Sequence, residues 1–191
     1  MTFQFKIQIE DITKPPVWRK VLVPETFTFH KFHQVIQAAF GWEDNHLYQF
    51  SEKENGASEI IGIPSDNDED DDWEVPVIDS RNKKLKDVFV KEGKRYIYIY
   101  DLSDDWVHKI FLEKIITEKK RKAACIDGKG ACPPENCGGV WGYEDIKETF
   151  IKNPKGKKAG EFRDWLGLEE DEIFDVNKFS LDDANALVAK V

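Results

Sequence analysis

Three cysteines in a segment rich in glycine and proline form one set of residues that could do chemistry. Four residues separate Cys132 from Cys137, which is the widest spacing that a zinc knuckle uses for a ligand pair. Cys125 would be a third ligand, and the distant His108 or His46 would have to be the fourth. Because the chain has no Cys-x-x-Cys pair, we favour structural, reduced thiols over a metal site. The sequence therefore predicts no cofactor, with zinc as the alternative.

Carboxylates beside a histidine form a second set. Asp101, Asp104 and Asp105 occupy an expected turn, and His108 follows in the next strand. Side chains of these types serve acid–base or metal chemistry. If Asp101 pairs across the turn with Trp106, then Asp101 and His108 become diagonal neighbours on one face of the hairpin. The other interpretation, which we favour, is turn chemistry, in which Asp side chains bond to the nearby backbone.

Aromatic side chains form a third set, and they suit binding better than catalysis. The chain has six Trp, and Trp and Tyr are typical anchors of protein interfaces. We expect some of them to line a groove between the sheet and a C-terminal loop, with the carboxylates and His108 at its rim. The candidate binding residues are Trp18, Trp42, Trp106, Trp141 and Tyr143.

Charge narrows the classes of partner. The net charge is −9, so a protein that grips nucleic acid with its whole surface is disfavoured, although a local patch is not. Two lysine clusters are interpreted as solvated, namely Lys119–Lys122 and the group Lys152, Lys155, Lys157 and Lys158. The acidic run 66–72 begins like a calcium loop, but Asp71 stands where Gly is needed and Val77 where Glu is needed. We therefore expect a solvated loop there.

The elements that must position these residues follow from hydrophobic periodicity. Alternation predicts strands at 3–9, 17–23 and 46–50, and a stripe of apolar residues predicts a helix at 32–40. A hairpin is expected from 95–100 and 106–116, because its residues are β-branched and aromatic. Residues 125–142 are expected to be loop, and short helices are expected near 143–151, 160–166 and 181–188, the last with a capping box from Ser180 and Asp183.

These elements define an α+β fold: a largely antiparallel sheet with one helix packed on it and a loop-and-helix C-terminal extension. At 191 residues we expect a single domain, 1–191, with a core at 1–118 and the extension at 119–191. No apolar run approaches the roughly 20 residues of a membrane span, and residues 1–20 lack a secretory pattern. A cytoplasmic protein with no membrane partner is therefore expected.

Several motifs together resemble the plasmid pRiA4b ORF-3-like family, whose members are found on plasmids, in mobile elements and in chromosomes. The residues that carry the resemblance are Trp18-Arg19-Lys20 with Val23-Pro24, His33 to Trp42, His46 to Phe50, Tyr100-Asp101, Asp104 to His108, Asp127-Gly128, Ala131 to Gly139, Gly142-Tyr143, Phe174-Asp175 and Phe179. The resemblance implies no settled activity and no established catalytic residues. The chain departs from the family pattern at three places. Asp101-Leu102-Ser103-Asp104 replaces the usual Asp-Phe-Gly-Asp turn, and Asn136 stands where Asp is common. Val176 follows Phe174-Asp175 at a position where the family often has Pro.

Three function classes follow, and whether the chain is an enzyme is left open. The first, which we favour, is a binding module associated with mobile elements, with an unknown protein or small molecule as its ligand. The second is a metal-dependent or acid–base enzyme that uses His108 and the hairpin carboxylates. The third is a nucleic-acid accessory protein that uses the lysine clusters. There is no Gly-rich phosphate loop and no Gly-x-Ser-x-Gly elbow, so the standard cofactor and hydrolase classes have no support.

Overall fold

One mixed sheet organises the chain in the computed structural model, which describes residues 1–64 and 75–191. Within these ranges eight strands run in the order β5-β4-β3-β6-β7-β1-β2-β8, and only β4 and β5 pair in parallel. The strands are β1 (Thr2–Thr13), β2 (Pro16–Pro24), β3 (Tyr48–Ser51), β4 (Ile60–Gly62), β5 (Val77–Asp79), β6 (Arg95–Tyr100), β7 (Trp106–Ile116) and β8 (Ala124–Lys129). The acidic run 66–72 lies outside the described residues.

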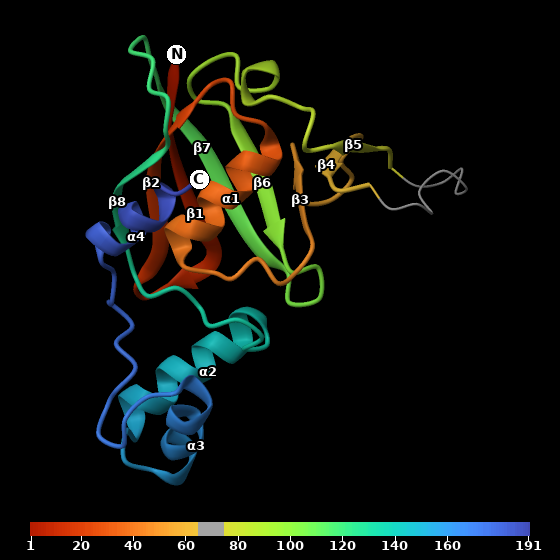
Figure 1. Cartoon of the computed structure of the whole chain (residues 1–191). Helices are drawn as coiled ribbons and strands as arrows, with labels where there is room; N and C mark the ends of the chain where they lie inside the picture. The colour runs from red at the N-terminus through yellow and green to blue at the C-terminus, as the bar shows by residue number, and fades with distance from the viewer. Residues whose placement is uncertain (65–74) are drawn as a thin grey trace.

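One face of the sheet packs against helix α1 (Phe29–Phe40), which crosses it in Figure 1. Strand β1 alternates as its sequence predicts, with Phe3, Phe5, Ile7 and Ile9 buried and the residues between them half-buried. Phe5 meets Phe32 of α1 with a 4.7 Å distance between ring centroids. Thr28 caps the start of the helix, where its side chain accepts a hydrogen bond from the Lys31 amide, and the left-handed Gly41 caps its end.

The hairpin of β6 and β7 forms as predicted. Its register differs by one residue from the one considered in the sequence analysis, in which Asp101 would lie opposite Trp106. Tyr100 lies opposite Trp106, and Tyr98 lies opposite His108. Asp101 leaves the strand because its backbone turns left-handed, with φ 57°, and its amide donates to the Leu47 carbonyl at 2.9 Å. A shift of one residue moves side chains to the other face of a strand, so Asp101 and His108 are not neighbours.

The C-terminal part adds a strand that the sequence analysis missed. Residues 124–129 form β8 and pair with β2 at the edge of the sheet, whereas we expected loop throughout 125–142. Three helices follow: α2 (Gly139–Lys152), α3 (Lys157–Leu166) and α4 (Leu181–Val188). At the start of α4, the Ser180 side chain accepts from the Asp183 amide, which is one of the two bonds of the expected capping box. Helix α4 packs back on β8 and α1, whereas α2 and α3 form an arm below the sheet (Figure 1).

A buried arginine ties this C-terminal part to the sheet. The Arg19 guanidinium donates to the carbonyls of Ala39, Trp18, Lys129 and Gly130 at 2.9 to 3.1 Å. Its guanidinium carbon lies 4.9 Å from the ring centroid of Phe40 and 4.3 Å from that of Phe179.

In the described part of the chain, the mostly antiparallel sheet with its four α-helices has the α+β fold that was predicted from the sequence. Among the described residues, no helix has both the length and the apolar character needed to cross a membrane.

Candidate functional site

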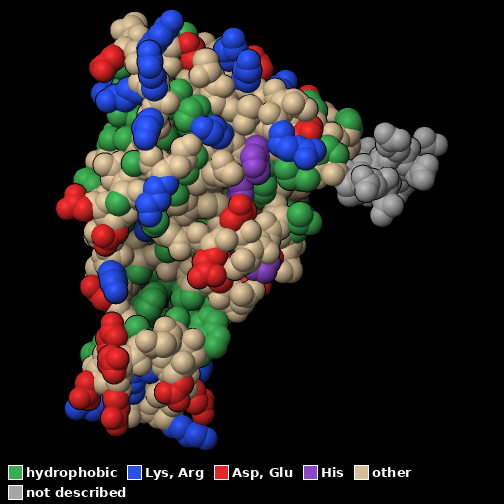
Figure 2. Space-filling view, in the orientation of Figure 1, with side chains coloured by type: hydrophobic (Ala, Val, Ile, Leu, Met, Phe, Trp, Pro, Cys, Tyr) green, Lys and Arg blue, Asp and Glu red, His purple; other side chains and the backbone are tan. Residues whose placement is uncertain are grey.

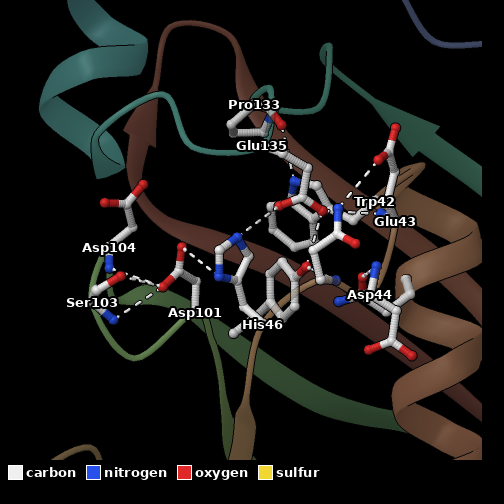
Figure 3. Close-up of polar contacts among 12 residues, drawn as sticks. Trp42, Glu43, Asp44, His46, Asp101, Ser103, Asp104, Pro133 and Glu135 are labelled. Carbon is white, nitrogen blue, oxygen red and sulfur yellow. Dashed lines mark hydrogen bonds and ion pairs between the residues drawn. The ribbon is translucent and has the colours of Figure 1, made fainter.

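A histidine between two carboxylates lies at the end of the sheet where β3, β6 and β7 meet their connecting loops. His46 precedes β3, and its Nδ1 is 3.6 Å from Oδ2 of Asp101. Its Nε2 is 3.7 Å from Oε2 of Glu135, which belongs to the loop after β8. Figure 3 shows the imidazole between these two side chains, one on each side. Three segments that are far apart in sequence therefore meet at one ring.

Asp101 is fixed by the turn that follows β6. Its Oδ1 accepts hydrogen bonds from the Ser103 amide at 3.1 Å, the Ser103 hydroxyl at 2.6 Å and the Asp104 amide at 3.4 Å. Burial works to raise the pKa of Asp101, but these hydrogen bonds outweigh burial and hold the pKa below its usual value. The turn chemistry that we favoured for Asp101 therefore forms, and it leaves Oδ2 facing His46.

Glu135 is held by donors from the opposite side of the site. Its Oε1 accepts from the Tyr100 hydroxyl at 2.9 Å and from the Glu43 amide at 2.9 Å (Figure 3). The indole of Trp42 donates to the Pro133 carbonyl at 2.9 Å and so fixes the start of the same loop. Burial, with a contribution from the carboxylate of Glu135, raises the pKa of Tyr100, so the phenol keeps its proton and donates it.

Helix α2 begins directly against the hairpin turn. The Gly138 amide donates to Oδ2 of Asp104 at 3.1 Å, which places a carboxylate at the first turn of the helix. At Gly139, where φ is +65°, an added Cβ would lie 2.8 Å from the Asp104 carbonyl oxygen. The close approach of these two segments therefore depends on glycine at 139.

Backbone strain is concentrated around this cluster. Among residues 1–64 and 75–191, five residues other than glycine have positive φ, and four of them lie in the segments of this cluster, namely Asp44, Asp101, Asp105 and Asn136. Such conformations cost free energy and persist where surrounding contacts enforce them, which is often at functional sites. Here the hydrogen bonds to Asp101 and Glu135 are contacts that hold the positive-φ conformations in place. This His46 cluster (His46, Tyr100, Asp101, Asp104 and Glu135) is the candidate site of the chain.

The geometry of His46 favours recognition over acid–base chemistry. A catalytic histidine uses one ring nitrogen for an orienting carboxylate and the other for the substrate. Here both nitrogens face carboxylates, and Nε2 is inaccessible to solvent without a hydrogen-bond partner. One imidazole faces two carboxylates here, and Asp104 adds a third, so the cluster carries excess negative charge.

His108, a candidate both for catalysis and for metal binding, lies in the core and not at the rim of a groove. Its Nδ1 is 2.7 Å from the Trp106 carbonyl, and aromatic rings enclose it, with 5.1 Å to the centroid of Trp42 and 5.2 Å to that of Phe40. Burial lowers the pKa of His108 to about 3. The prediction that placed it beside the carboxylates is wrong, because the one-residue shift of the hairpin points it inward.

The aromatic candidates do not share one groove. Trp42 and Trp106 are in the core, and Tyr143 is buried with its hydroxyl donating to the Ala131 carbonyl at 2.9 Å. Trp18 points to the sheet face opposite α1, beside Lys6. Of the five, Trp141 alone is largely exposed, on the first turn of α2.

The cysteines are thiols in or near the core. Cys125 lies on the buried side of β8, and burial raises the pKa of all three thiols, that of Cys137 to about 12. Across residues 1–64 and 75–191, no three His, Cys, Asp or Glu side chains are grouped as metal ligands. The set of Cys125, Cys132, Cys137 and His108 is therefore not brought together. The absence of a cofactor stays a prediction.

Two members of the site, and the partner of a third, are not marked by the sequence patterns described above. Tyr100 and Glu135 were not singled out, and His46 was considered only as a distant zinc ligand. No local periodicity marks them, because they meet through contacts between segments more than 30 residues apart. The signal that was available is the set of family motifs, since His46, Tyr100-Asp101 and Glu135 each fall inside one of those blocks.

Comparison with known proteins places the whole chain beside uncharacterised relatives. The sequence model of the plasmid pRiA4b ORF-3-like protein family matches residues 1–183. An uncharacterized protein, y4hQ, of Sinorhizobium fredii is 33% identical over 162 residues, which are 84% of this chain and 78% of the relative. The crystal structure of MM3350, a protein of unknown function from Methanosarcina mazei, is similar with a TM-score of 0.77 and 34% identity, over 95% of this chain and 96% of that one.

Proposed function

The chain belongs to the plasmid pRiA4b ORF-3-like family, and from that premise we propose that it is a binding module that docks a protein partner beside the His46 cluster. The observation that carries the proposal is the exposure of Trp141, whose side chain is 87% accessible. Tryptophan is rarely so exposed unless it serves an interface, where it is among the most common energetic anchors.

Two further apolar side chains accompany Trp141 at this end of the sheet. Leu47 is 65% exposed and Leu102 is 46% exposed. Leu47 adjoins His46, and its carbonyl accepts from the Asp101 amide, while Leu102 belongs to the turn that Gly138 contacts through Asp104. Figure 2 shows hydrophobic side chains gathered where the helical arm meets the sheet, next to acidic ones. Exposed apolar surface of this kind supports an interaction site.

Charge at the same end indicates the chemistry of the partner. Glu43 and Asp105 are exposed, and Asp104 and Glu135 are half-buried beside them. A partner segment that carries apolar side chains next to Lys or Arg would complement this surface, because buried apolar area supplies affinity and opposite charge supplies orientation. We call this region, formed by Leu47, Leu102, Trp141 and these carboxylates, the loop-end surface.

A selection from a displayed peptide library tests the proposal. The full chain is immobilised, and the expected enriched peptides combine large apolar residues with Lys or Arg. Trp141→Ala should weaken their binding by about 2 kcal/mol, roughly 30-fold, as the loss of an interface anchor does. Trp165→Ala is the matched control, because Trp165 is 50% exposed on α3, away from the loop-end surface, and should leave binding unchanged.

Two results would contradict the proposal. One is a selection in which no peptide is enriched over the bare support. The other is a set of enriched peptides that bind the Trp141→Ala protein as tightly as the unaltered one, since the docking surface would then lie elsewhere.

A further inference from the structure

The sheet has a second face that no helix of the described chain covers. On β1 and β2 the residues that point away from α1 are half-buried, while their neighbours on the other face are buried. We call this surface the open face. A hollow of about 610 Å³ lies on it, and the charged residues that line it are Lys6, Lys53, Arg95 and Lys109 together with Glu10, Glu52 and Glu54. The uncharged side chains of its floor include Gln8, Ile97 and Phe111.

Strand register arranges the side chains of the open face in two rows that cross five strands. In one row, Lys20, Lys6, Phe111 and Arg95 lie opposite one another from β2 to β6, with Asp127 of β8 beyond Lys20. In the other row, Lys129, Trp18, Gln8, Lys109 and Ile97 follow in the same way from β8 to β6. At 4.8 Å between strands, the span from Lys20 to Arg95 is about 14 Å.

The two rows are strongly basic in a chain that is acidic as a whole. They hold five basic side chains and one acidic side chain, whereas the net charge of the chain is −9. Glu113 and Glu10, outside the rows, pair with Lys20 and Lys109. The other three cations, Lys6, Arg95 and Lys129, make no ion pair within the described part of the chain. Of the glutamates at the hollow, Glu10 and Glu52 are themselves paired, with Lys109 and Lys94. The open face thus offers a ligand the three cations Lys6, Arg95 and Lys129.

Two aromatic rings lie among these cations. The Lys6 ammonium is 5.0 Å from the Trp18 ring centroid, and the Arg95 guanidinium is 5.8 Å from that of Phe111. Trp18 and Phe111 are two strands and two residues apart, which places their backbones about 12 Å from each other. Both rings therefore present π surface on the same basic face.

From these rows we infer that the open face binds single-stranded nucleic acid, with the cations on phosphates and with bases stacked on Trp18 and Phe111. A sheet that presents aromatic rings among Lys and Arg is suited to splayed bases and does not enter a duplex groove. A second copy of the chain would bring the three unpaired cations against the same three, which opposes self-pairing through this face. This site is separate from the loop-end surface and does not depend on it.

Fluorescence anisotropy of the full chain with labelled 12-nucleotide oligo(dT) and oligo(U) tests the inference, and the two arms distinguish DNA from RNA. We expect binding at 50 mM salt that weakens about twenty-fold at 200 mM, as for roughly three phosphate contacts on a single strand. Trp18→Ala should weaken binding about ten-fold, because one stacked base is lost. Trp141→Ala, which removes an exposed ring from the loop-end surface, should not change it.

A matched pair of charge reversals completes the test. Arg95→Glu with Lys129→Glu alters two exposed side chains of the open face and should abolish binding. Lys119→Glu with Arg121→Glu changes the net charge equally at exposed positions outside the rows and should weaken binding less than three-fold. Circular dichroism establishes that each variant is folded.

Four outcomes would overturn the inference: no binding at 50 mM salt, equal effects of the two double variants, tighter binding of a duplex of the same length, or displacement of the oligonucleotide by hexaglutamate at equal concentration. The last would identify an acidic peptide as the ligand of this face.

Discussion

Replacing His108 should change how the stability of the protein depends on pH, and this gives a direct test of the core described above. In the folded chain His108 is fully buried, and burial lowers its pKa to about 3. In the unfolded chain the pKa of a histidine is about 6.5. As the pH falls below 6.5, the unfolded state therefore binds a proton that the folded state does not bind. The stability that the neutral ring provides is complete above pH 6.5 and is lost as the pH falls toward 3.

The size of this effect follows from the two pKa values. Between pH 8 and pH 5, a group with pKa 6.5 unfolded and about 3 folded lowers the free energy of unfolding by about 2 kcal/mol. His33 is also buried, hydrogen-bonded to Asp44 at 2.7 Å, and burial lowers its pKa to about 4. It adds a further loss of about 2 kcal/mol over the same range. Together the two histidines should lower the free energy of unfolding by about 4 kcal/mol between pH 8 and pH 5.

Urea unfolding followed by tryptophan fluorescence at pH 8, 7, 6 and 5 measures the effect. His108→Phe removes the titrating group while keeping a ring among the aromatic neighbours, and its loss of stability from pH 8 to pH 5 should be about 2 kcal/mol smaller than that of the unaltered chain. His108→Leu should show the same difference, because only the slope with pH is compared. If both variants keep the slope of the unaltered chain, His108 is not a buried neutral histidine and the reasoning is refuted.

Two other substitutions test contacts that hold the C-terminal part on the sheet. Arg19→Met should lower the free energy of unfolding by about 3–5 kcal/mol, since it removes the donor from four carbonyls, two of them in fully buried hydrogen bonds and two in part-buried ones. Arg19→Lys should recover only part of this loss because lysine has fewer donors. A loss under about 1 kcal/mol in urea unfolding would show that the bonds are not needed. Gly139→Ala should lower the free energy of unfolding by at least about 2 kcal/mol, because the backbone there is left-handed and the added Cβ would lie 2.8 Å from the Asp104 carbonyl oxygen. Gly160→Ala, in α3, should raise the free energy of unfolding by about 0.5–1 kcal/mol, because an added Cβ would meet no atom within 4 Å. Equal melting temperatures of the two glycine variants would contradict this account.

The sheet and its covering helix were predictable because their residues repeat with a clear period. The predicted strands 3–9 and 17–23 lie inside β1 and β2, and the predicted helix 32–40 lies inside α1. Strand β8 was not predictable in this way. It contains Asp127 and Gly128, residue types that are depleted in strands, and its place is set by pairing with β2 about 100 residues earlier in the chain.

The candidate site was predictable only in part. Asp101 was singled out from the sequence and belongs to the candidate site, but its partner was expected to be His108, because residues within one hairpin are the neighbours that a sequence shows most directly. The structure instead joins it to His46, about 55 residues earlier in the chain, and adds Glu135 from a loop after the last strand. A hairpin register off by one residue exchanges the two faces, so a small error in the turn changed the whole assignment.

The arm formed by α2 and α3 should unfold locally more easily than the rest of the molecule. Its own core consists of Ile146, Phe150 and Ala159, and a hydrogen bond of 3.0 Å from the Ala131 amide to the Val176 carbonyl joins the two ends of the segment that carries it. A unit with so small a core and adjoining ends can unfold locally while the sheet stays intact. Its amide protons should then exchange with solvent sooner than those of β1 and β7. Each such opening would release Gly138 from Asp104, so this contact at the edge of the His46 cluster lasts only while the arm stays folded.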